Sequence, residues 1–161
     1  MPHTVSAFEQ ADLAWVLEIN RIHEALLSPL DANGLAALVA EARLARVIRP
    51  QSAFMVVFDQ SAAYDSPNFK WFVERYPRFL YVDRIAVSPE AGGGGYGRAL
   101  YDDLFRQAEA LGHTTICAEV NSAPPNPGSL AFHDRLGFEA VGEAHLPDRG
   151  KSVRYFARTL G

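Results

Sequence analysis

Two hydrophobic patterns meet in the middle of the chain. Residues 80–87 alternate as expected of a β-strand, with Leu80, Val82, Arg84 and Ala86 predicted on one face and Tyr81, Asp83, Ile85 and Val87 on the other. In residues 99–111 apolar side chains recur at helical spacing, and Gly112 follows as a C-terminal cap. The pattern therefore predicts a strand, a loop and a helix in succession.

The other segments follow the same two patterns. Further strands are predicted at 3–8, 45–50, 53–59, 114–120, 138–143 and 152–157. Further helices are predicted around the apolar sets Leu13, Val16, Leu17 and Leu27; Leu35, Leu38 and Val39; and Leu130, Phe132 and Leu136. Asp31 and Ser129 are the expected N-caps of the last two helices. With one strand–helix–strand crossover in this order, we predict an α/β fold: a mixed sheet with helices on both faces, in a single domain of residues 1–161.

Residues 61–77 carry three aromatic side chains, Phe69, Trp71 and Phe72, inside a polar stretch that prolines bound. This composition predicts a loop with one short helix, placed so that it can roof a site. Tyr64 and Asp65 in the same stretch are candidates for binding a cationic amine.

Composition excludes several classes of protein. The chain has 161 residues and a net charge of −4, which argues against a nucleic-acid partner. We find no apolar stretch long enough to cross a bilayer and no signal peptide, so we expect no membrane partner and a cytoplasmic location. Cys117 is the single cysteine, which excludes an intrachain disulfide and favours a buried thiol over a nucleophile. No metal is expected, because thiolate zinc sites are excluded and the histidines lack metal-ligand spacing: His3, His23, His113 and His145.

The loop between the predicted strand and helix holds five glycines in residues 92–97. Glycine adopts left-handed conformations, so consecutive backbone amides can converge on one anion. The helix that follows adds unpaired N–H groups and the positive end of its dipole. The junction is therefore a candidate phosphate site, although a mobile turn has the same composition.

Two motifs at this spacing resemble those of the GNAT superfamily of N-acetyltransferases, in an uncharacterised bacterial branch. Val87-Ser88-Pro89 followed by Gly95-Tyr96-Gly97 is similar to the first signature. The second is matched by Asn126, Ser129, Phe132 and Leu136-Gly137-Phe138. The resemblance implies a mostly antiparallel sheet of six to seven strands, about four helices, and two central strands that splay apart.

The resemblance also implies acetyl-CoA as co-substrate and a small-molecule or peptide amine as its partner. The pantetheine arm would pair with the predicted strand as an added strand does, and the glycine loop would hold the pyrophosphate. Asn126 would bond the arm, or else serve only as a turn residue. The coenzyme contacts expected on this basis are Ile85, Ala86, Val87, Gly92, Gly93, Gly94, Gly95, Tyr96, Gly97, Arg98, Asn121, Asn126, Ser129 and Phe132.

Two departures from the family pattern change these expectations. Gly92 and Gly94 stand where relatives often carry arginine, which leaves Arg98 and the backbone to hold the pyrophosphate. Loss of one charge-assisted hydrogen bond weakens coenzyme binding by about tenfold to a hundredfold. His133 stands where many members place the tyrosine that protonates the leaving thiolate; it either takes that role or is a packed helix-surface histidine.

The remaining candidates act on the acceptor amine. If the strand is regular, Asp83 faces the cleft as a general base; the alternative is an ion pair with a nearby arginine. Tyr81 is expected to hold substrate or join a water relay, and Glu119 is a further possible cleft residue. The family mechanism would be direct transfer, with a backbone N–H near Val87 stabilising the oxyanion.

Two other functions stay open at this stage. A non-catalytic acyl-CoA-binding or regulatory domain would keep the glycine loop and lose the proton donors. A dinucleotide-binding enzyme would use Glu119 as the acidic residue some twenty positions after its loop, but it leaves the Leu-Gly-Phe motif unexplained. Because open sheet edges in this fold are often covered by pairing, we also expect a homodimer.

Overall fold

The computed structural model describes residues 3–123, 126–147 and 150–160. Within them, seven strands form one mixed sheet in the order β1-β2-β3-β4-β5-β7-β6. Neighbouring strands are antiparallel except for β4 and β5, which are parallel. The predicted fold class is confirmed. The strands are β1 (Ser6–Ala7), β2 (Leu44–Ile48), β3 (Ala53–Asp59), β4 (Leu80–Val87), β5 (Thr115–Ala123), β6 (Glu139–Leu146) and β7 (Lys151–Thr159).

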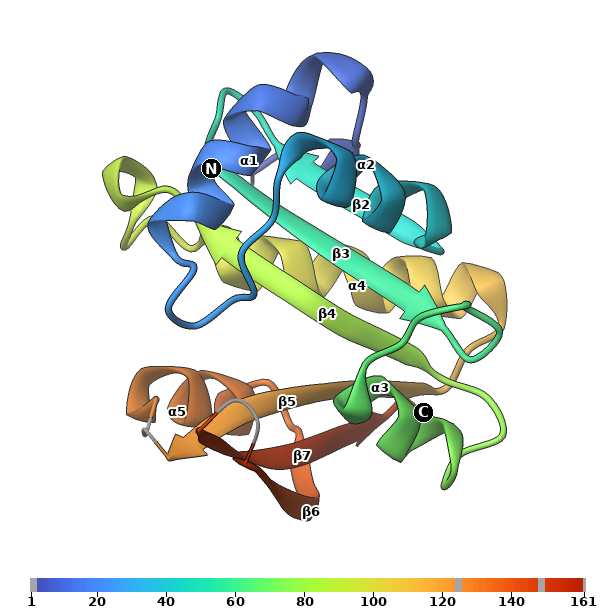
Figure 1. Ribbon diagram of the computed structural model, residues 1–161. Helices are drawn as coiled ribbons and strands as arrows, with labels where there is room; N and C mark the ends of the chain where they lie inside the picture. Colours follow the sequence, from blue (N-terminus) through green and yellow to red (C-terminus); the bar gives the residue numbers. More distant parts are fainter. Residues whose placement is uncertain (1–2, 124–125, 148–149, 161) are drawn as a thin grey trace.

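Helices cover both faces of the sheet (Figure 1). One core lies under α4 and α5, where Leu100 and Leu104 pack on the sheet. The other lies under α1, α2 and α3, around Phe54, Phe58 and Phe72. The α-helices are α1 (Leu13–Ile22), α2 (Ala32–Glu41), α3 (Pro67–Val73), α4 (Tyr96–Leu111) and α5 (Pro127–Arg135), with 3-10 turns at Gln10–Asp12 and Pro89–Ala91. Among the described residues, no helix is long and apolar enough to cross a membrane.

Several local predictions are confirmed and others are corrected. Asp31 caps α2 by accepting a hydrogen bond from the Gly34 N–H at 2.7 Å, and Gly112 ends α4 in a left-handed conformation. The helix predicted to run to Leu27 ends at Ile22. The predicted Ser129 cap of α5 is wrong. Asn126 is the N-cap, and Ser129 supplies the N–H that its side chain accepts.

A β-bulge in β4 overturns the regular alternation predicted for that strand. Val57 pairs with Val82 and Val56 with Arg84, so Asp83 is an extra residue without a partner on β3. As a result Arg84 lies on the face of Tyr81, in contact with Asn20 of α1, whereas Val82 and Ile85 both face α4. The bulge therefore turns Asp83 and Arg84 toward the side of α1 and α3.

The sheet splits beyond the start of β4. The parallel pairing of β4 with β5 covers only Leu80 with Ile116 and Tyr81 with Cys117. From there the two strands diverge, and Figure 1 shows the opening between them. The carboxyl half of β4 is thus a strand edge with no partner strand on the side of β5.

Candidate functional site

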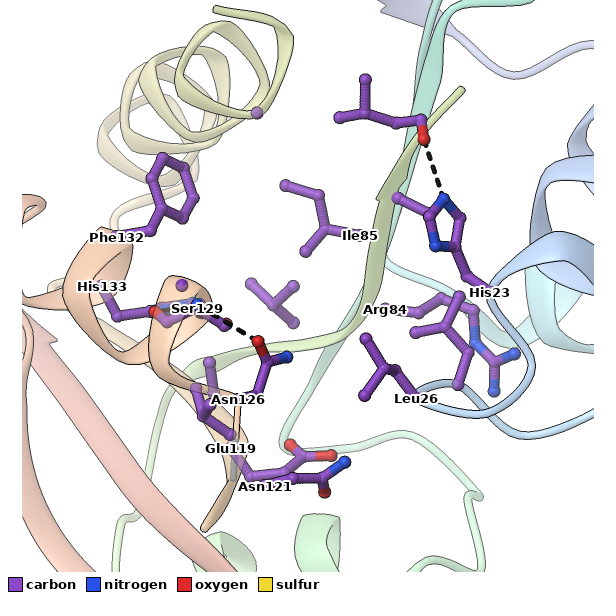
Figure 2. Close-up of a pocket in the computed structure, with 18 of the residues that line it drawn as sticks. His23, Leu26, Arg84, Ile85, Glu119, Asn121, Asn126, Ser129, Phe132 and His133 are labelled. Atoms are coloured by element: carbon purple, nitrogen blue, oxygen red, sulfur yellow. Dashed lines mark hydrogen bonds between the residues drawn. The ribbon is translucent and has the colours of Figure 1, made fainter. Parts of the chain in front are cut away.

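The main cleft, of about 400 Å³, lies where β4 and β5 diverge. Its walls come from β4, β5, the start of α4, α5 and the residues after α1. Figure 2 shows Phe132 and His133 on one side of β4 and His23, Leu26 and Arg84 on the other. The cleft therefore passes from one side of the sheet to the other.

The backbone of β4 offers hydrogen-bonding groups to this cleft. The Ser88 N–H donates to the Ser52 carbonyl of the β3 side at 2.7 Å, and in an antiparallel ladder alternate residues point the same way. The N–H and C=O groups of Ile85 and Val87 accordingly point away from β3, toward the split. His23 Nε2 donates to the Val87 carbonyl at 2.9 Å, which leaves Ile85 and the Val87 N–H open to an extended ligand.

The glycine loop ends at the start of α4. Gly93 and Gly95 have φ of 83° and 78°, in the left-handed region that favours glycine. Gly95 is the N-cap of the sixteen-residue α4, whose first N–H groups follow. Arg98 is exposed and bonds Asp102 at 3.2 Å. The ring of His3 stacks on Tyr96. Among the described glycines of residues 92–97, Gly97 is the one that lines the main cleft.

The start of α5 forms the wall opposite β4. Asn126 caps the helix through Oδ1, which accepts from the Ser129 N–H at 3.3 Å, and both residues line the cleft with Phe132. A Cβ on Gly97 would lie 3.3 Å from the Phe132 ring, so glycine lets α4 and α5 approach closely. Asn121 lines the cleft, and its carbonyl accepts from the Asn126 N–H.

His133 is buried, with 3% of its surface exposed, and is not a helix-surface residue. Its Nδ1 lies 2.8 Å from the Ser129 carbonyl, which can only accept, so Nδ1 carries the proton. Nε2 must then accept from the Tyr101 hydroxyl at 2.7 Å. Burial lowers the pKa of His133. The imidazole is therefore neutral and both of its nitrogens are engaged, while His133 and Tyr101 line the cleft together.

Asp83 is paired with two groups. It accepts from Nε of Arg84 at 2.8 Å and from the Tyr64 hydroxyl at 2.6 Å. Both side chains of the ion pair are about 95% buried. This arrangement matches the ion-pair alternative for Asp83. Asp65, in contrast, is exposed and pairs with Lys70.

The better-placed base is Glu119 on β5. Its side chain accepts from the Tyr81 hydroxyl at 2.7 Å and from the Asn68 amide at 3.2 Å. Burial raises the pKa of Glu119 to about 7, with a smaller contribution from Asp83. Glu119 lines the main cleft and also a second hollow of about 60 Å³ behind it. A carboxyl that titrates near neutral pH in a cleft is suited to general base catalysis.

Sequence reasoning gave Glu119 a minor place and missed Tyr101. Nothing adjacent to Glu119 in the sequence marks it, because its partners Tyr81 and Asn68 lie 38 and 51 residues away. A signal does exist for Tyr101: it follows Gly97 by one helical turn and so shares the face of α4 that looks into the cleft. Tyr81 is fully buried and reaches the site through Glu119.

Comparison with known proteins agrees with this geometry. A family model described as the acetyltransferase (GNAT) family matches residues 37–138. A search of curated proteins gives no significant match.

Similar solved structures include the ribosomal-protein-S18-alanine N-acetyltransferase of Escherichia coli, with 19% identity, a TM-score of 0.70, and 99% of this chain and 94% of that chain covered. A second is yncA of Salmonella typhimurium, a putative acetyltransferase with its cofactor acetyl-CoA, with 18% identity, a TM-score of 0.73, and coverage of 100% and 95%. A third is Chaetomium thermophilum Naa20 in complex with a bisubstrate analogue, with 18% identity, a TM-score of 0.73, and coverage of 98% and 86%.

Proposed function

Since the chain belongs to the acetyltransferase (GNAT) family, and is thereby an acyltransferase, we propose that it moves the acetyl group of acetyl-CoA directly to a primary amine. One observation carries the proposal: Glu119, with a pKa of about 7, lies in the same cleft as the free edge of β4. A base for the amine and a backbone edge for the thioester thus meet at one place. The family membership removes the dinucleotide-binding alternative.

The free edge of β4 is the proposed seat of the pantetheine arm. Ile85 and the Val87 N–H pair with the amides of the arm as an added strand would, and Asn126 closes it from α5. The loop around Gly93 and Gly95, at the start of α4, takes the pyrophosphate. When bound, acetyl-CoA supplies the activated carbonyl; a β4 N–H that points into the split stabilises the oxyanion.

Glu119 removes a proton from the incoming ammonium, because its carboxylate form predominates above pH 7. The Tyr81 hydroxyl and the Asn68 amide hold the carboxylate in place. The neutral amine then attacks the carbonyl without an intermediate bound to the enzyme. Asp83 keeps Arg84 and Tyr64 in position instead of accepting the proton.

His133 and Tyr101 form the proposed route for the proton that the thiolate receives. The second proton that the amine loses as the amide forms balances the proton that sulfur receives: it passes through water in the cleft to the Tyr101 oxygen, while the Tyr101 hydroxyl proton goes to sulfur. Nε2 of His133 accepts from that hydroxyl at rest and holds it in position. Tyr101 then never has to exist as a phenolate, which its burial disfavours by raising its pKa.

Titration calorimetry with acetyl-CoA, followed by an acetylation screen over amines, tests the function. We expect heat of binding and acetylation of at least one amine. No heat and no thermal shift at millimolar acetyl-CoA would remove the coenzyme site. Binding without acetylation of any amine would instead leave a coenzyme-binding protein.

A further inference from the structure

The second hollow extends the site on the acceptor side. It lies between the residues after α1, the 64–68 segment, β4, β5 and the start of β7. It shares Asp83, Arg84, Glu119 and Asn121 with the main cleft. Glu119 lines both cavities. The substituents of an amine that lies beside this carboxylate can therefore extend into the second hollow.

The acidic groups on the wall of this hollow already have partners. Glu119 accepts from Tyr81 and Asn68, and Asp83 accepts from Tyr64 and from Nε of Arg84. Neither carboxylate lacks a donor, so neither calls for a second cation beyond the amine that approaches Glu119.

The basic groups are different. Arg84 uses Nη1 for the Asn20 side chain and the Ser28 carbonyl, but Nη2 has no partner among the described residues. Among the described residues, Nδ1 of His113 is the one side-chain nitrogen or oxygen that is both buried from solvent and without a hydrogen-bond partner. Since Nη2 of Arg84 has no partner and is not such an atom, it is accessible to solvent. Lys151, the first residue of β7, lines the hollow and has no hydrogen-bond partner there either.

These open donors favour an anion of a definite kind. Nε and Nη1 of Arg84 are already occupied, so the rigidly held guanidinium presents the N–H groups of Nη2, which can donate to a carboxylate oxygen, and the nearby Lys151 ammonium adds charge. Arg84 is 4% exposed, so water screens it weakly, but its charge is matched by that of Asp83, and Lys151 supplies the positive charge that an incoming carboxylate needs. A volume of about 60 Å³ admits a small group and not a continuing chain.

Given the proposed acetyl transfer, on which this inference rests, we propose that the acceptor is a free α-amino acid or a close analogue. Its amine meets Glu119, and its carboxylate enters the second hollow and binds Nη2 of Arg84 and Nζ of Lys151. In an α-amino acid a single carbon joins the amine to the carboxylate. The carboxylate can therefore enter the second hollow while the amine stays beside Glu119, because Glu119 itself lines that hollow.

Matched acceptors test this proposal. Each of the twenty common L-amino acids is compared with its primary amide, which keeps the amine and removes the negative charge, and acetyl-CoA binding is measured by calorimetry in the same preparation. We expect at least one amino acid to exceed its amide by about tenfold or more in kcat/KM, as a charge-assisted hydrogen bond implies. Comparison at several pH values separates this effect from the lower pKa of the amide's amine.

Two variants locate the effect. Lys151→Gln is expected to raise KM for the preferred amino acid about threefold to tenfold and to leave its amide unchanged. Arg84→Lys keeps the charge that Asp83 needs and removes Nη2, so the preference over the amide should largely disappear. Lys70→Gln, a lysine exposed elsewhere on the surface, is the matched control and should change neither substrate.

The outcomes distinguish the two proposals. If acetyl-CoA binds and no amino acid exceeds its amide at any pH, or if none is acetylated, the carboxylate site is wrong, and acetyl transfer is then decided by the screen over other amines. The same holds if Lys151→Gln and Arg84→Lys both leave the preference intact. If acetyl-CoA itself gives no heat, the proposed function fails first.

Discussion

The two sides of the β4–β5 split are built in different ways. On the side proposed for the coenzyme, the site consists mainly of backbone groups: the free edge of β4, the left-handed Gly93 and Gly95, and the first turn of α4. On the acceptor side, buried side chains form the site: Glu119, Arg84 and Asp83, held by Tyr81, Asn68 and Tyr64.

This difference separates a site formed by the main chain from one formed by side chains. A backbone edge and a glycine loop accept the same extended arm whatever the side chains are. The charged groups around Glu119 instead come from the side chains of β4 and β7, and their neutral partners Asn20 and Asn68 come from α1 and α3. Changes on one side should therefore leave binding on the other side intact.

Replacement of the base should have the largest effect. Glu119→Gln keeps the size of the side chain and removes the proton acceptor, so we expect kcat/KM to fall at least about a hundredfold with acetyl-CoA affinity unchanged. In the unaltered protein, kcat/KM should rise with pH through about 7, as the carboxylate forms. This rise of kcat/KM with pH should be absent in Glu119→Gln. Glu143→Gln, exposed on β6, is the control. An unchanged pH profile in Glu119→Gln would assign the base elsewhere.

The proton route at α5 gives the next effect. Tyr101→Phe removes one hydroxyl and keeps the packing, and we expect turnover to fall about tenfold or more while the Kd for acetyl-CoA stays within about twofold. His133→Ala should also lower turnover more than coenzyme affinity, with a loss of stability because it leaves a cavity among aromatic rings. Rapid-quench kinetics and calorimetry separate the two quantities. Full turnover in Tyr101→Phe would leave this pair a structural role only.

On the coenzyme side, Gly95→Ala should weaken acetyl-CoA binding and spare the acceptor side. An alanine held at a φ of 78° costs about 1–2 kcal/mol, so the exposed loop of the variant should relax when free and have to regain this shape around the ligand, which corresponds to about fivefold to thirtyfold in Kd. Gly92→Ala is a control within the same loop, because Gly92 has a φ of −57° and its Cβ would make only ordinary contact. Equal Kd values for the two variants would mean that the loop does not hold the pyrophosphate.

The same division decides how much could be predicted from the sequence. The strand, loop and helix around residues 80–111 are contiguous and were predictable from local pattern. Asp83 lines the cleft, but regular alternation places it on the face of Ile85, and the bulge that moves it to the other face depends on pairing with β3, which no local pattern reports. Asn126 took the capping role predicted for Ser129, since Pro127 favours the first helical position.

Glu119 shows why the acceptor side resists prediction. Its raised pKa is a property of its surroundings, namely burial between β4 and α3 with Tyr81 and Asn68 as partners. A glutamate near the end of a strand has no such property by itself. The segment 61–77 was expected to roof a site, and it does line the second hollow through Tyr64, Ser66 and Asn68.

The smallest expected effect is also the sharpest test of the acceptor side, because it changes a residue outside the cleft wall. The Tyr81 hydroxyl stabilises the Glu119 carboxylate and so lowers its pKa against the effect of burial. In Tyr81→Phe the pKa of Glu119 should rise, so kcat/KM at pH 7 should fall about twofold to tenfold and recover at higher pH. Tyr76→Phe is the control, since the Tyr76 ring packs on Phe72 and, among the described residues, its hydroxyl bonds neither Glu119 nor the partners of Glu119. A uniform loss of activity at every pH would make Tyr81 a packing residue. A shift of the rise in kcat/KM to higher pH would show that the buried hydrogen-bond network determines the pKa of Glu119.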